Sequence, residues 1–110
     1  MSAKFIKTET VEKSNYKDFK LKATDFYQGI EVAQEARLWH TMGVTAVHAT
    51  ISIGDALTTN YLGVRSTAED HRLAKKNAIT YEQRRFTEKE ALEIAKQAQR
   101  FYDWAIKQLP

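Results

Sequence analysis

The sequence predicts an all-α fold, an up-down four-helix bundle in one domain. Three observations favour this class. Apolar residues recur at steps of three and four along most of the chain. The chain has one proline, Pro110, and four glycines, whereas β folds need many turn residues. Its 110 residues suit a single hydrophobic core, and short connections between the predicted helices favour antiparallel neighbours.

Composition and charge narrow the class of protein. Hydrophobic residues make up 43% of the chain, which is typical of a globular domain. The formal net charge of +3 permits contact with nucleic acid without requiring it. The absence of cysteine excludes disulfides and thiolate zinc sites.

The chain divides into an extension and a bundle. Residues 1–13 show no clear period, and we expect an N-terminal extension that is either frayed or packs Phe5 and Ile6 on the bundle. Residues 14–110 are predicted to form the helical bundle. The first residues lack the apolar run of a signal peptide, so we predict a cytoplasmic protein.

The first helix is predicted to begin near Ser14 or Asn15, both good N-cap residues, and to end around Arg37. Its apolar residues alternate at steps of four and three, which places them on one face. That face consists of Phe19, Ala23, Phe26, Ile30 and Ala33.

The second helix is predicted to run from Trp39 or Thr41 to Leu62. It contains no Lys or Arg and a single carboxylate, Asp55, so we expect it to lie at the centre of the bundle. Residues 41–61 are about as long as a membrane span, but their polar residues favour a buried helix and no membrane. Gly63 follows as the left-handed residue that ends the helix.

Two capping boxes predict the starts of the third and fourth helices. The third opens at Ser66-Thr67-Ala68-Glu69 and ends in the polar stretch of residues 82–85. The fourth opens at Thr87-Glu88-Lys89-Glu90 and continues for more than twenty residues. Its inner face is predicted to contain Ala91, Ile94, Ala95, Ala98, Phe101, Tyr102, Ala105, Ile106 and Leu109.

A polar stripe interrupts the apolar second helix. His48, Ser52 and Asp55 stand at i, i+4 and i+7 and therefore share one helix face. A buried carboxylate is costly unless it is paired, so Asp55 needs a partner. Either Asp55 holds a neighbouring helix through an arginine and His48 is a core histidine, or the stripe orients catalytic side chains.

A second cluster surrounds the predicted start of the third helix, where Arg65 and Ser66 precede Asp70 and His71. An arginine beside a helix N-terminus, with a histidine inside the helix, suits a phosphate group. Arginine supplies a permanent charge, and histidine exchanges protons near neutral pH. The alternative is that Arg65 simply pairs with Asp55 or Glu69.

Other candidates are weaker. His40, beside Trp39, is expected on the surface. No His-x-x-x-His or Glu-x-x-His pair occurs, and no glycine-rich phosphate loop, so we predict neither a metal site nor a cofactor. A basic group flanks the third helix and forms either a solvated face or a surface for RNA; it contains Lys75, Lys76, Arg84 and Arg85.

The spacing of Arg65 and His71, the polar Asp55 in the preceding helix and the four-helix plan resemble those of the HEPN-domain family. The likeness covers roughly residues 14–109. Many HEPN proteins are homodimers that cut RNA without a metal ion. The resemblance implies that Arg65 binds the scissile phosphate, that His71 transfers a proton, and that Asp55 orients one of them. The product would carry a cyclic phosphate.

The resemblance also suggests partners. Some members act in toxin–antitoxin or defence systems, and some stand beside a nucleotidyltransferase. We therefore expect a homodimer, with RNA and an antitoxin or nucleotidyltransferase as candidate partners, and His48, Ser52, Ser66 and Asp70 as supporting residues. The alternative is a homodimeric, non-catalytic helical module that binds a nucleotide or a protein.

Overall fold

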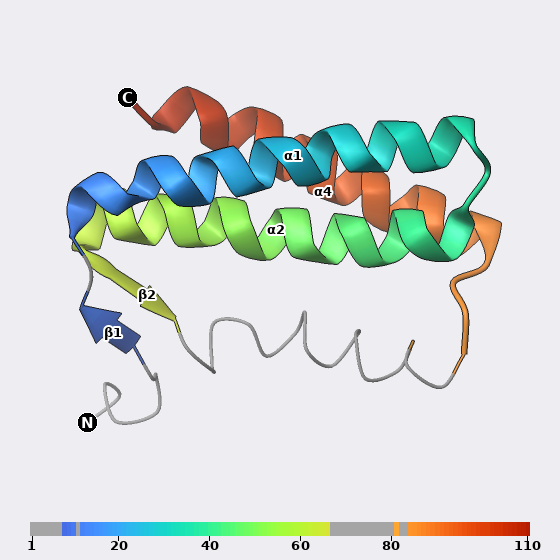
Figure 1. Ribbon diagram of the computed structural model, residues 1–110, viewed down its shortest axis with the longest axis horizontal. Coiled ribbons are helices and arrows are strands. Elements are labelled where there is room, and N and C mark those ends of the chain that lie inside the picture. The colour runs from blue at the N-terminus through green and yellow to red at the C-terminus, as the bar shows by residue number, and fades with distance from the viewer. Residues whose placement is uncertain (1–7, 11, 67–80, 82–83) are drawn as a thin grey trace.

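The computed structural model describes residues 8–10, 12–66, 81 and 84–110. Three long helices dominate this part of the chain (Figure 1). They are α1 (Tyr16–Glu35), α2 (Trp39–Leu62) and α4 (Glu88–Gln108), and a 3-10 turn, η2 (Lys13–Asn15), precedes α1. The all-α prediction is confirmed for these helices. The predicted third helix lies outside the described residues apart from Tyr81.

The predicted central position of the second helix is confirmed. Both α1 and α4 pack on α2, and they contact each other less extensively. Figure 1 shows α1 running antiparallel to α2, whereas α4 runs parallel to α2. Because α2 has no Lys or Arg and only one carboxylate, it can be covered on two sides with little loss of charge solvation.

Alanine dominates the described core. The helices meet through small methyl side chains, which let neighbouring helices approach closely. The largest side chains that are almost fully buried belong to Ile30, Met42, Ile53 and Thr59. The buried alanines are Ala23, Ala33, Ala46, Ala49, Ala56, Ala91, Ala95, Ala98 and Ala105.

The helix ends follow local backbone chemistry. Asn15 precedes α1 but its side chain forms no cap hydrogen bond, since its backbone is already helical within the 3-10 turn. At the other end, Arg37 adopts a left-handed φ of 56°. The Leu38 N–H donates to the Ala33 carbonyl and the Arg37 N–H to the Gln34 carbonyl, which is the Schellman pattern. Gly63 ends α2 with a φ of 68°, as predicted.

The start of α4 confirms the predicted capping box. The Thr87 hydroxyl accepts from the Glu90 N–H at 3.2 Å, and the Glu90 carboxylate accepts from the Thr87 N–H at 3.0 Å. Arg84 adds a two-pronged ion pair with Glu90, with N–O distances of 2.9 and 2.8 Å. This hydrogen-bonded guanidinium holds the pKa of Glu90 well below its usual range.

Two short strands accompany the helices. Strand β1 (Thr8–Thr10) pairs antiparallel with β2 (Val64–Ser66), with Glu9 opposite Arg65. β2 begins two residues after α2 ends and contacts it. No pattern in the sequence predicts this pairing, which fixes the backbone of residues 8–10 beside the end of α2.

Candidate functional site

A buried polar face runs along the C-terminal half of α2. Ser52, Asp55 and Thr59 are 7%, 5% and 0% exposed. They stand at i, i+3 and i+7 and share one side of the helix. The Asp55 residue is not isolated, in keeping with the cost of burying an unpaired carboxylate. The structure thus brings Ser52 and Asp55 together and adds Thr59, which the sequence analysis did not select.

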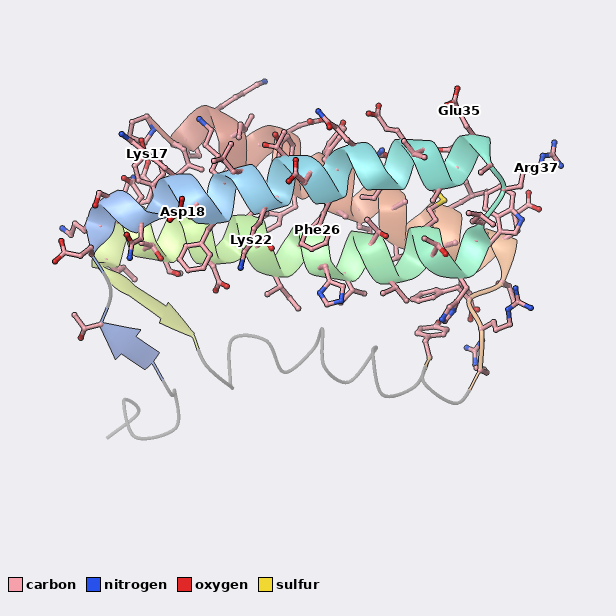
Figure 2. The ribbon with its side chains drawn as sticks, in the orientation of Figure 1. Lys17, Asp18, Lys22, Phe26, Glu35 and Arg37 are labelled. Carbon is pink, nitrogen blue, oxygen red and sulfur yellow. The ribbon has the colours of Figure 1, made fainter. Side chains whose placement is uncertain are left out.

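His48 does not share this buried environment, although it lies on the same side of α2. Its side chain is exposed, and its ring stacks on Phe26 with a centroid distance of 5.4 Å. Figure 2 shows Phe26 reaching from α1 toward α2, whereas Glu35 points away from the bundle. The expectation of a core histidine is therefore wrong, because His48 lies at the outer edge of the α1–α2 contact.

The second predicted cluster is described only in part. Arg65 and Ser66 belong to β2, so their backbone is placed by pairing with β1. Ser66 is the last residue of this strand, and extended backbone is also usual for an N-cap residue. Asp70 and His71 lie outside the described residues, as does the helix predicted to contain them. Arg65 belongs to β2, and β2 contacts α2, the helix that contains Asp55.

The hydroxyl of Thr59 is a buried polar group without a hydrogen-bond partner among the described residues. We expect Thr59→Val to raise the free energy of unfolding by about 1 kcal/mol, because it removes an unsatisfied hydroxyl at nearly constant volume. Urea denaturation followed by circular dichroism measures this change. Thr50→Val is the control, since the Thr50 hydroxyl donates to the Ala46 carbonyl at 3.1 Å. A gain with Thr50→Val as large as that with Thr59→Val, or no gain with Thr59→Val, would contradict the assignment.

His40 has a structural role that the sequence analysis missed. It is half-buried rather than on the surface, and its Nδ1 accepts from the Phe86 N–H at 3.1 Å. The Phe86 ring packs against Gly43, one turn further along α2, and stacks on Tyr81 with a centroid distance of 3.6 Å. In the sequence, the only local sign of this contact is Gly43, three residues after His40, and it does not indicate Phe86 as the partner.

A groove opens between the C-terminal halves of α2 and α4. It has a volume of about 350 Å³. Tyr61 and Trp104 are 56% and 55% exposed in it. Among the described residues, no charged side chain lines the groove, which is formed by Leu57, Thr58, Tyr61, Trp104 and Gln108.

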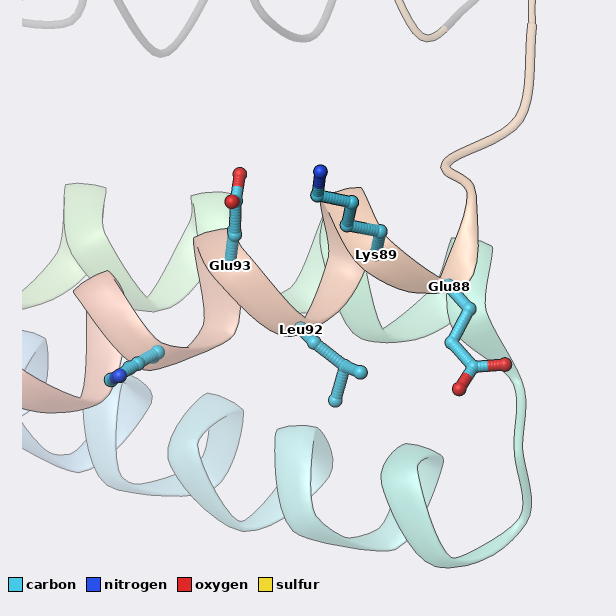
Figure 3. Close-up of a pocket in the computed structure, with 5 residues that line it drawn as sticks. Glu88, Lys89, Leu92 and Glu93 are labelled. Carbon is cyan, nitrogen blue, oxygen red and sulfur yellow. The ribbon is translucent and has the colours of Figure 1, made fainter.

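A larger hollow, about 460 Å³, lies along the N-terminal half of α4. The described residues that line it all come from this one helix, and Figure 3 shows Leu92 and Glu88 on one side and Lys89 and Glu93 on another. Its charges alternate in sign, which is typical of a solvated helix face. We assign it no ligand.

Charged and aromatic neighbours determine the state of two further side chains, Arg84 and Tyr27. Arg84 belongs to the basic group that the sequence offers as a possible surface for RNA. It forms an ion pair with Glu90 and lies over the Tyr81 ring, 4.6 Å from the ring centroid. Burial, followed by the nearby Asp103, raises the pKa of Tyr27, so this phenol stays protonated.

Within the described ranges, no group of three His, Asp or Glu residues could hold a metal ion. No described helix is long and apolar enough to cross a membrane.

Comparison with protein-family models, curated proteins and solved structures gives no match for this chain.

Proposed function

We propose that the protein is a HEPN-like, metal-independent endoribonuclease that acts as a homodimer, in a toxin- or defence-type system. One observation supports this most directly. Asp55 is a buried carboxylate two turns before the end of α2, and Arg65 belongs to β2, which begins two residues after α2 ends and contacts it. The arginine and carboxylate required by the proposal therefore belong to elements in contact.

The three proposed catalytic residues have separate tasks. Arg65 binds the scissile phosphate and stabilises the charge that develops on its oxygens. His71 takes the proton of the ribose 2′-hydroxyl, whose oxygen attacks phosphorus, or gives a proton to the leaving 5′-oxygen. The P–O5′ bond breaks, and the products are a cyclic phosphate and a 5′-hydroxyl. Asp55 orients one of the two side chains from α2.

The test is incubation of total RNA with the wild type, Arg65→Ala and His71→Ala in the presence of EDTA, with the cut ends mapped. We expect the wild type to leave cyclic phosphate ends and each variant to cut at least about 100-fold more slowly. Lys17→Ala is the control, since Lys17 is an exposed basic residue on α1 and outside the proposed site. Equal cutting by the wild type and both variants would refute the assignment.

Melting curves separate catalytic from structural roles. If Arg65 and His71 act in catalysis, each alanine variant should lose less than about 1 kcal/mol of stability. If Arg65 is instead the buried partner of Asp55, its removal should cost about 3 kcal/mol or more. Two variants that melt far below the wild type would remove the main support for catalysis.

A second candidate is a non-catalytic helical module that binds a nucleotide or protein. The exposed, uncharged groove with Tyr61 and Trp104 favours this alternative, because aromatic groups are frequent in binding surfaces. RNA binding without any cleavage by the wild type would favour this module over the nuclease.

A further inference from the structure

We infer that the groove between α2 and α4 binds single-stranded RNA, with Tyr61 and Trp104 as stacking surfaces for its bases. The inference rests on the proposed function, because it names the substrate as single-stranded and gives it a second point of attachment. It concerns residues that the proposed chemistry does not use.

The two aromatic rings are exposed yet held in place. The Tyr61 hydroxyl donates to the Gln108 carbonyl, which ties the end of α2 to the end of α4. The Trp104 ring stacks on Phe101 with a centroid distance of 6.2 Å and an angle of 17° between the ring planes. More than half of each side chain nevertheless remains exposed. Rings fixed in advance lose little conformational freedom when a base stacks on them.

The charge around the groove suits a polyanion. On α4, the neighbours of Trp104 at i−4 and i+3 are Arg100 and Lys107, and both are exposed. The neighbours at i−3 and i+4 are Phe101 and Gln108, and the nearest carboxylate on α4 is the exposed Asp103, which stands at i+3 from Arg100 and i−4 from Lys107. Aromatic groups beside basic side chains are the combination used to bind single strands without sequence preference.

The position of the groove fits the proposed cleavage site. Tyr61 stands four residues before Arg65, so their Cα atoms lie no more than about 14 Å apart. A strand with a base on Tyr61 would therefore pass close to the backbone of Arg65. A volume of about 350 Å³ is at the lower end of the range for small-ligand sites.

The test measures binding of a short fluorescein-labelled oligouridylate by anisotropy, in a His71→Ala background so that the RNA stays intact. We expect Trp104→Ala to weaken binding about tenfold and Trp104→Phe to retain most of it, because phenylalanine still offers a ring. Leu21→Ala is the control, since Leu21 is 64% exposed on α1 and outside the groove. We expect Arg100→Ala with Lys107→Ala to weaken binding and to reduce its salt dependence.

Unchanged RNA affinity in Trp104→Ala would overturn the inference. It would also be overturned if Trp104→Ala converted a dimer into a monomer in sedimentation while RNA affinity stayed the same, since the groove would then be an interface between copies. The proposed function fails separately. If the wild type cuts RNA but Trp104→Ala binds normally, only the groove is refuted; if Trp104-dependent binding occurs without cutting, only the nuclease is refuted.

Discussion

Phe86→Ala is expected to lower the free energy of unfolding by about 3–5 kcal/mol, the usual cost of truncating a buried phenylalanine. The Phe86 side chain is 6% exposed and lies between α2 and the segment before α4. Its removal would leave a cavity beside Gly43. It would also end the stacking with Tyr81 at 3.6 Å and the tilted ring contact with His40 at 5.7 Å. Urea denaturation followed by circular dichroism measures the loss.

Phe86→Leu provides the matched control. Leucine keeps most of the buried apolar volume but loses the aromatic contacts, so its cost should be clearly smaller. The backbone N–H that donates to His40 is present in both variants. A loss below about 1 kcal/mol for Phe86→Ala would mean that this ring does not hold the start of α4 on α2.

Gly43→Ala and Gly54→Ala are expected to change stability in opposite directions. Both glycines lie inside α2, where alanine alone favours the helix by about 1 kcal/mol. A Cβ at Gly43 would lie 2.4 Å from the Phe86 ring, whereas no atom of the described part of the chain lies within 4 Å of a Cβ at Gly54. We expect overpacking of about 1–3 kcal/mol to outweigh the helix preference at Gly43.

The comparison needs only thermal or urea unfolding of the two variants. Gly54→Ala should gain about 0.5–1 kcal/mol, and Gly43→Ala should show a net loss of up to about 2 kcal/mol. Combining Gly43→Ala with Phe86→Ala should remove the clash, so the double variant should be less destabilised than the sum of the two losses. Strict additivity would argue against the contact.

The long helices could be predicted because their signals are local. The bounds of α2 could be predicted from its apolar character and from the glycine that follows it. The helix runs from Trp39, one of the two predicted starts, to the predicted end at Leu62. The capping box at Thr87 defined the start of α4 in the same way. Such signals depend on hydrogen bonds within a few residues, so they can be recognised without knowledge of the tertiary fold.

Features that depend on distant residues could not be predicted. The pairing of β1 with β2 joins three-residue strands that are too short for a recognisable alternation. The end of α1 uses Arg37 in a conformation for which glycine is the usual signal. In the candidate site, the buried face of Ser52 and Asp55 followed from helical spacing, but the exposure of His48 depends on where α1 covers α2.

The pairing of β1 with β2 closes the intervening chain, which includes all of α1 and α2, into a ring. The backbone of Arg65 is therefore hydrogen-bonded to a segment near the N-terminus. A force or displacement applied to Thr8–Thr10 is transmitted to the strand that contains this arginine. A purification tag or fusion partner joined just before β1 would act on the proposed catalytic strand across more than fifty residues of sequence. Activity assays are best made with tags at Pro110 or with none.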